Sequence, residues 1–233
     1  AHSGLMQTIA RVHRTGFEDI YTRLSANPAT GLSSKDQGAR ALRNTALTYL
    51  CLNEDDRYLD LALKQRREAL NMTSELGALE ALNRSKKGQR LAALQDFRAK
   101  WEKESLVMNK WLMIRAIAPG EKTLAEVKEL LNDGAVFDKT NPNKIYSLLL
   151  GFAKFNLLGF HTVSGEGYRF LADQVLEIDA RNPQVASRVI SAFNQWKTFD
   201  SKRQALMKAE LERIAKHPGL SNNVNEIVTR SLA

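Results

Sequence analysis

The sequence has 233 residues, of which 34 are Lys or Arg and 26 are Asp or Glu, giving a formal net charge of +8. Its 43% of hydrophobic residues is enough for a sizeable core. The single cysteine excludes an internal disulfide and fits a reducing compartment, so we expect a cytoplasmic location. No apolar run approaches the ~18 residues that span a bilayer, so we expect no membrane partner.

Apolar residues recur at helical spacing through the first two thirds of the chain. The first stripe runs over residues 5–24 and predicts one long helix. The same spacing predicts further helices over residues 34–50, 58–70, 73–82, 91–101, 106–117 and 123–131. Ser34 and Thr73 are the expected N-caps of two of these helices. Thr123, followed three residues later by Glu126, is typical of a capping box.

Two Asn-Pro pairs punctuate the last third, Asn141-Pro142 and Asn182-Pro183. Each predicts an N-cap followed by proline at the first helical position, where its missing N–H is not needed. The pairs are 41 residues apart and enclose one predicted helix-turn-helix unit, residues 142–156 and 165–178. The remaining predicted helices cover residues 182–199, 201–216 and 221–232.

A period near 40 residues built from helix pairs is typical of armadillo/HEAT proteins. We therefore predict an all-α fold, an α-superhelix of stacked antiparallel helix pairs. Strand-like alternation is absent from the sequence and no linker is obvious, so residues 1–233 are predicted to form one domain. The chain begins inside a helical pattern, and we expect the first helices of that domain to lie outside it.

The sequence offers no catalytic centre. Its four histidines are His2, His13, His161 and His217, and none belongs to a His-Glu-x-x-His pair that could aim two imidazoles at one metal. We therefore predict no catalytic residue, no metal ligand and no cofactor within this chain. Cys51 lies in an apolar run and is predicted to be a buried, unreactive core residue.

The positive charge is spread along the chain. Its densest clusters are Lys64, Arg66, Arg67 and Arg84, Lys86, Lys87, Arg90. Glu68 directly follows the first cluster, and neither cluster has the interleaved aromatic residues that stack on bases. We interpret them as solvated helix faces and expect no nucleic-acid partner.

One polar face has the right spacing for binding. Gln184 and Arg188 are four residues apart at the start of a predicted helix, in line with Ser191 and Gln195. The adjacent stripe is apolar and comprises Val185, Val189, Phe193 and Trp196. An arginine close to a positive helix N-terminus suits a carboxylate such as the end of a peptide. An ordinary solvent-facing polar stripe is the alternative.

Several longer motifs are spread along nearly the whole chain. They comprise Arg40-x-Leu42-Arg43-Asn44, Leu106-Val107-Met108-x-Lys110-Trp111, Asn141-Pro142-Asn143, Phe160-His161, Gly165-x-Gly167-Tyr168, Asn182-Pro183-Gln184-Val185-Ala186-x-Arg188 and Arg203-Gln204-x-x-Met207. Together these motifs resemble the C-terminal domain of the aminopeptidase N family of zinc gluzincin peptidases, in its bacterial and apicomplexan branch.

The resemblance implies a division of labour. A catalytic domain elsewhere in the same polypeptide would hold the zinc and remove N-terminal amino acids from peptides. The present chain, inactive alone, would cover the active site and line the access channel. Gln184 and Arg188 would line that channel. Tyr146 would be a further channel position, although bacterial members carry an arginine there. The implied partners are the catalytic domain and peptide substrates.

A second hypothesis is a stand-alone helical-repeat scaffold that binds a peptide or an acidic protein in its concave face. A His-Glu-x-x-His motif upstream in the reading frame would favour the enzyme.

Overall fold

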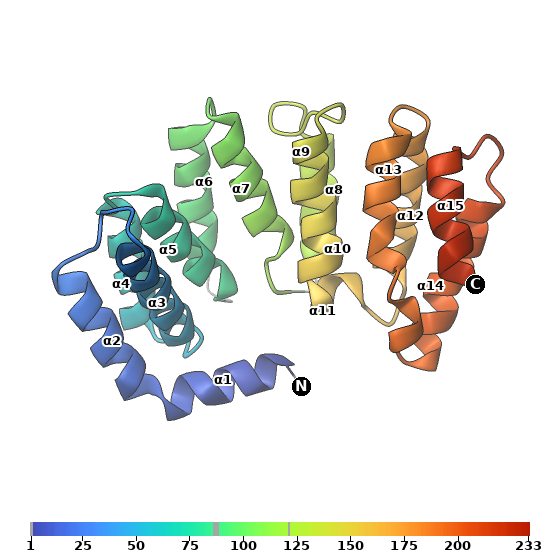
Figure 1. Ribbon diagram of the computed structural model, residues 1–233. Helices are drawn as coiled ribbons and strands as arrows, with labels where there is room; N and C mark the ends of the chain where they lie inside the picture. The colour runs from blue at the N-terminus through green and yellow to red at the C-terminus, as the bar shows by residue number, and fades with distance from the viewer. Residues whose placement is uncertain (1, 86–88, 121) are drawn as a thin grey trace. The chain divides into compact units, whose positions relative to one another are not determined.

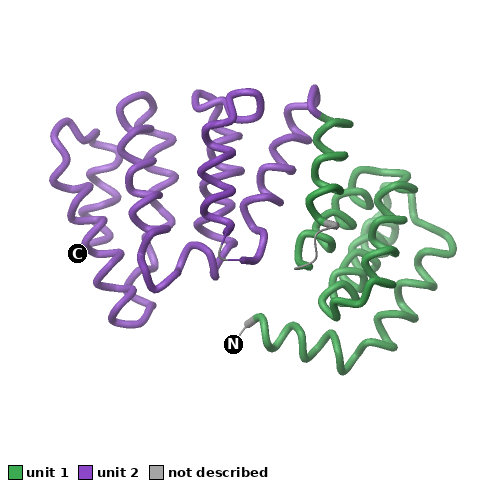
Figure 2. The backbone as a smooth tube through the Cα atoms, turned by 180° about the vertical axis from the view of Figure 1, so that it is seen from behind, with its two compact units in different colours: residues 1–101 green, residues 102–233 purple. Residues whose placement is uncertain are grey.

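The structure is a computed structural model that describes residues 2–85, 89–120 and 122–233 (Figure 1). All regular elements within these ranges are helical and none is a strand, which confirms the predicted all-α class. The chain divides into two compact units, residues 1–101 and 102–233 (Figure 2). The prediction of a single domain over residues 1–233 stays a prediction.

Unit 1 is built around a long central helix. Its helices are α1 His2–Val12, α2 Arg14–Ala26, α3 Ser34–Cys51, α4 Asp56–Arg67, α5 Met72–Arg84 and α6 Gln89–Trp101. Helix α3 packs against α2, α4 and α5, and α6 packs against α5. The leucines on their facing sides are almost completely buried, namely Leu47, Leu50, Leu59, Leu79, Leu82 and Leu94.

Unit 2 is a row of helices that stand side by side (Figure 1). Its α-helices are α7 Ser105–Ala116, α8 Thr123–Asn132, α9 Pro142–Ile145, α10 Gly151–Phe155, α11 Leu157–Phe160, α12 Glu166–Asp179, α13 Pro183–Ile190, α14 Ser201–Ala215 and α15 Asn222–Leu232. Helix α13 packs against α12 and α15, and α14 packs against α12 and α15.

Helices α9 and α10 are joined by a π-helical segment, η1 Tyr146–Leu150. The three form the continuous helical rod predicted for residues 142–156. Three consecutive leucines of η1, Leu148, Leu149 and Leu150, are buried, and the segment contacts α7, α8 and α13. Helices surround η1 on several sides, which explains why consecutive residues can all be buried. Segments of this kind often occur at functional sites.

Three predicted caps were wrong. Ser33, not Ser34, caps α3 by accepting the Asp36 N–H, and Asn71, not Thr73, caps α5 by accepting the Ser74 N–H. The hydroxyl of Thr123 donates to the carbonyl of Ala118 instead of closing a capping box. The carboxylate of Glu126, its expected partner residue, pairs with Arg115 at 3.2 Å.

Two long helices predicted from spacing are interrupted. The stripe over residues 5–24 breaks at His13, and the bend lets Met6 and Phe17 contact the same side chain, Tyr49. The helix predicted over residues 182–199 ends at Ile190 and continues as short 3-10 turns. There the Trp196 indole N–H donates to the Ser231 carbonyl at 2.8 Å, which ties the chain to α15.

Candidate functional site

The candidate site spans two neighbouring helices of unit 2 that begin alike. Asn141 accepts backbone N–H groups of Asn143 and Lys144, and Asn182 accepts the Val185 N–H at 3.1 Å. Proline occupies the first turn in both cases, as the sequence predicts. The π segment after α9 contacts α13.

The structure brings Arg188 and Tyr146 together. The guanidinium carbon of Arg188 lies 4.8 Å from the centroid of the Tyr146 ring. Arg188 and Gln184 are exposed and Tyr146 is half-buried. A cation over an aromatic face at an exposed position is worth about 0.5–1 kcal/mol, enough to orient the guanidinium while leaving its N–H groups available. We name Tyr146, Lys154, Gln184, Arg188 and Ser191 the α9–α13 face.

Lys154 belongs to this face although the sequence analysis did not single it out. Its ammonium donates to the hydroxyl of Ser191 at 3.1 Å, and that hydroxyl donates to the Arg188 carbonyl at 2.7 Å. Its position, eight residues after Tyr146 on the same helical rod, was the available signal. Among the described residues, no carboxylate forms an ion pair with Arg188 or Lys154, so the face carries two uncompensated cations.

Of the two stripes predicted for residues 182–199, the structure confirms the apolar one in full and the polar one only in part. The apolar residues Val185, Val189, Phe193 and Trp196 are all buried, as predicted. The polar stripe is shorter than predicted. It holds through Ser191, but Gln195 lies beyond the end of α13, between the two 3-10 turns.

The N-terminus of α13 offers less to a ligand than its sequence indicates. Pro183 has no N–H, and the Val185 N–H is taken by the side chain of Asn182. The positive charge that this face presents therefore comes from the side chains of Arg188 and Lys154 more than from the backbone of the helix end.

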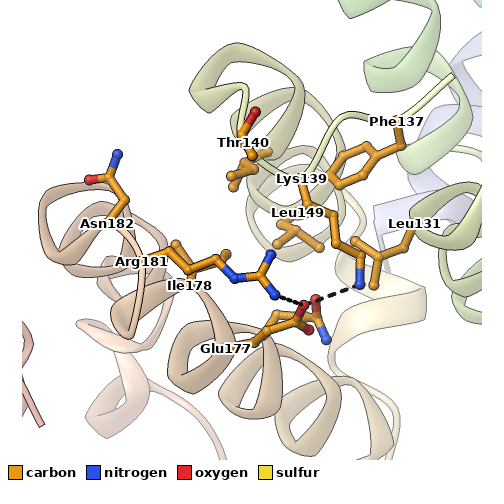
Figure 3. A pocket seen from close by; sticks show the side chains of 11 residues that line it. Leu131, Phe137, Lys139, Thr140, Leu149, Glu177, Ile178, Arg181 and Asn182 are labelled. Atoms are coloured by element: carbon orange, nitrogen blue, oxygen red, sulfur yellow. Dashed lines mark hydrogen bonds and ion pairs between the residues drawn. The ribbon is translucent and has the colours of Figure 1, made fainter. Parts of the chain in front are cut away.

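A cavity of about 180 Å³ opens beside the start of α13 (Figure 3). Its wall includes the buried apolar side chains of Leu131, Phe137, Ile145, Leu149 and Ile178. The Glu177 carboxylate forms one ion pair with Lys139 at 3.1 Å and another with Arg181 at 3.7 Å. Because these cations share a carboxylate, the cavity offers a ligand mainly apolar surface.

His161 is half-buried in an aromatic cluster. Its Nδ1 lies 2.9 Å from the Tyr168 hydroxyl, and its ring stacks on Phe199 at 4.2 Å. Burial and the nearby Arg203 guanidinium lower the pKa of His161 to about 4, and burial raises the pKa of Tyr168 to about 12. Both groups are therefore neutral at physiological pH.

Metal-binding geometry is not found in the part of the chain that the structure describes. No three His, Cys, Asp or Glu side chains there come together to hold a metal ion. Cys51 is fully buried, which confirms its predicted place in the core, and burial raises the pKa of its thiol to about 12. The described residues therefore do not fit a zinc site.

The two basic clusters have partly different surroundings. Lys64 and Arg67 are exposed, as predicted, but the side chain of Arg66 is only 10% exposed and pairs with Asp96 at 2.8 Å. Lys86 and Lys87 lie outside the described residues. No described helix is long and apolar enough to cross a membrane.

Comparison with known proteins identifies the family. Residues 1–233 match the family profile described as "Domain of unknown function (DUF3458_C) ARM repeats", and the chain belongs to that family. The match confirms the predicted armadillo-like architecture.

Curated relatives and a solved structure agree with this assignment. The chain is 36% identical over 232 residues to aminopeptidase N of Haemophilus influenzae, covering 100% of this chain and 26% of the relative. It is 39% identical to aminopeptidase N of Escherichia coli, covering 85% of this chain and 23% of the relative. A crystal structure of Legionella pneumophila aminopeptidase A in complex with aspartic acid matches 98% of this chain and 27% of that one, with 30% identity and a TM-score of 0.87. The predicted resemblance to the aminopeptidase N family is confirmed, and the chain spans about a quarter of these relatives.

Proposed function

We propose that this chain is the substrate-gating C-terminal domain of a zinc aminopeptidase that removes N-terminal amino acids from peptides. The observation that carries the proposal is the match of this chain to about a quarter of two aminopeptidase N relatives, over 100% of the chain in one case and 85% in the other. The zinc and the catalytic residues would lie in another part of the same polypeptide, because the described residues of this chain group no metal ligands. A cytoplasmic location is part of the proposal and rests on the single buried cysteine.

The α9–α13 face would be the part of this domain that meets the peptide. Arg188 and Lys154 supply positive charge without a bound carboxylate, which suits the C-terminal carboxylate of a short peptide. Gln184, one turn before Arg188, offers both a donor and an acceptor to the peptide backbone. Tyr146 would hold the guanidinium in place by stacking. The neighbouring apolar cavity could accept a hydrophobic side chain of the same peptide.

The stand-alone scaffold remains the second candidate, and the uncompensated cations of the same face favour it equally for an acidic peptide. The two candidates differ in the rest of the gene product. A zinc-binding His-Glu-x-x-His motif encoded upstream of Ala1 is expected for the enzyme and not for the scaffold.

The division of labour is tested with two purified proteins, the 233-residue chain and the full-length polypeptide that contains it. We expect the full-length protein to bind zinc stoichiometrically and to hydrolyse aminoacyl reporter substrates, and the isolated chain to do neither. Metal-dependent turnover by the isolated chain would contradict the proposal. A full-length protein without aminopeptidase activity would favour the scaffold.

A further inference from the structure

Four large apolar side chains at one end of unit 2 lie mostly in solvent. Phe155 is 65% exposed, Leu157 54%, Leu158 60% and Val163 56%. Phe155 ends α10, the two leucines begin α11, and Val163 lies in the turn between α11 and α12. We name these four residues the α10–α11 patch, and Figure 1 shows α11 at the lower end of α10. Exposed apolar groups of this kind mark surfaces on which another surface packs.

The backbone that carries the patch is anchored to the core of unit 2. Asn156, in the middle of the patch, is buried, and its amide nitrogen donates to the carbonyls of Ala116 and Ala118 at 3.0 and 2.8 Å. Phe160 is fully buried, and its ring packs edge-on against that of Tyr168 with 5.2 Å between the centroids. The core therefore takes Asn156 and Phe160 from this segment and leaves the neighbouring apolar side chains outside.

The grouping distinguishes the patch from the other exposed apolar side chains of the described chain. Among the described residues of unit 2, the only other large one is Leu106, at the start of α7. Those of unit 1 are spread over residues 5–91. A single exposed leucine is ordinary protein surface, whereas four large apolar side chains within nine consecutive residues are not.

The length of the relatives indicates what covers the patch. The chain spans about a quarter of its aminopeptidase N relatives, so most of the proposed enzyme would lie outside it. The proposed function requires that remaining part to approach the α9–α13 face. The patch adjoins this face, because Phe155 directly follows Lys154, whose ammonium donates to the Ser191 hydroxyl at 3.1 Å. The same part of the polypeptide can therefore reach both surfaces.

A second copy of this chain fits the patch less well. A stable dimer interface buries about 800 Å² on each partner and involves about 20–30 residues a side. The patch has four apolar residues, and Val163 already borders a polar rim, where the hydroxyls of Thr162 and Ser164 lie 3.0 Å apart. A small contact suffices between parts of one polypeptide, because the covalent connection keeps the two surfaces at a high effective concentration.

We propose that the α10–α11 patch is a contact surface on which apolar side chains from the remaining part of the full-length polypeptide pack. The patch side chains leave water in this contact, and the end of α10 is held against the part of the polypeptide that carries the active site. This contact presupposes the proposed function, because a stand-alone scaffold would lack the domains that cover the patch.

Hydroxyl-radical footprinting, which measures how fast each side chain is oxidised in solution, compares the 233-residue chain with the full-length polypeptide. Phe155 and Leu158 are expected to react about fivefold or more slowly in the full-length protein, because the centre of an interface is almost fully buried. Leu106, which has no exposed apolar neighbour on α7, is expected to change by less than about twofold.

Matched variants separate a specific contact from general shielding. In the full-length protein, Leu158→Ser is expected to return the oxidation rate of Phe155 toward its value in the 233-residue chain. Leu106→Ser, which removes an equally exposed leucine elsewhere in unit 2, is expected to leave Phe155 protected. Both variants of the 233-residue chain are expected to melt within about 2 °C of the wild type, because exposed side chains contribute little to the stability of the isolated fold.

Three outcomes would count against the proposal or the function on which it rests. Equal oxidation of Phe155 in the two wild-type proteins would overturn the contact. Dimerisation of the 233-residue chain that Leu158→Ser abolishes would overturn it as well, because the patch would then belong to a second copy. Aminopeptidase activity of the same full-length sample is measured separately, so an active enzyme with an exposed patch rejects the contact alone. An inactive protein with a protected patch rejects the proposed function alone.

Discussion

Arg43 in unit 1 and Arg188 in unit 2 are both arginines without an ion-paired carboxylate in the described structure, but they differ in burial. Arg43 is 6% exposed and has a single hydroxyl partner, whereas Arg188 is exposed and lies over the Tyr146 ring. Water already solvates Arg188, so a ligand adds little to the stability of the fold there. Arg43 has little contact with solvent, so loss of hydration costs more there than at Arg188.

The contrast separates two environments for an arginine that has no carboxylate partner. An exposed cation held by an aromatic ring can meet a passing substrate and release it again. A buried cation instead needs the surrounding protein to supply its partners. The packing of each unit determines how its arginine is surrounded, so variants that change this packing or these contacts test the comparison.

The largest expected effect concerns the glycines that set the packing of each unit. A Cβ on Gly167 would lie 2.5 Å from the Phe160 carbonyl oxygen, and one on Gly77 would lie 2.2 Å from the Asn44 side chain. The Phe160 carbonyl belongs to the backbone and cannot rotate aside as a side chain can. We therefore expect Gly167→Ala to lower the free energy of unfolding by about 2–3 kcal/mol. Gly77→Ala, which displaces a side chain, should cost about 1–2 kcal/mol.

Urea unfolding of the two variants gives these values, with Gly38→Ala as the control. Gly38 lies inside α3 with nothing within 4 Å of a new Cβ, so alanine there should stabilise by about 0.5 kcal/mol. A Gly167→Ala variant as stable as the wild type would show that α12 is not held against the end of α11.

A smaller effect is expected from His161, a half-buried titratable group of unit 2. Its pKa is about 4 in the folded chain and about 6.5 when unfolded, so between these values only the unfolded chain binds the proton. The free energy of unfolding should therefore fall as pH drops from about 6.5 to about 4, by about 1–2 kcal/mol after screening.

Urea midpoints across this pH range measure the effect, and His161→Gln should flatten that part of the curve. Equal slopes in the variant and the wild type would mean that His161 titrates normally and is not enclosed by the Tyr168 and Phe199 rings.

A still smaller effect is expected at Tyr146. In the full-length polypeptide, Tyr146→Ala removes the ring under Arg188 and should lower kcat/KM for short peptides about twofold to fivefold. Tyr146→Phe retains the ring face and should behave like the wild type. A loss in the Phe variant equal to that in the Ala variant would assign the role to the hydroxyl and contradict the stacking account.

The sequence predicted what depends on local chemistry. The Asn141 and Asn182 caps, the buried stripe from Val185 to Trp196 and the buried Cys51 all follow from residue type and spacing. The break after Ile190 is accompanied by a hydrogen bond from Trp196 to Ser231, a contact between distant parts of the chain that no local pattern reveals.

The candidate site likewise has features that the sequence predicts and features that depend on the packing of distant helices. Gln184 and Arg188 share a helix, so their common face was predictable, and the family resemblance supplied Tyr146. The contact of Arg188 with Tyr146, the role of Lys154 and the cavity beside α13 depend on which helices pack together. Arg43 appeared in the sequence only as part of a motif. Its lack of a carboxylate partner could be recognised only once its surroundings were known.

The most direct test of the central claim measures how the full-length polypeptide discriminates between a peptide with a free C-terminal carboxylate and the same peptide amidated. If the α9–α13 face meets the substrate, the wild type prefers the carboxylate, and Arg188→Glu lowers the ratio of the two kcat/KM values about fivefold to tenfold. Arg230→Ala, which removes another exposed arginine of unit 2, leaves the ratio unchanged. An unchanged ratio in Arg188→Glu would contradict the account.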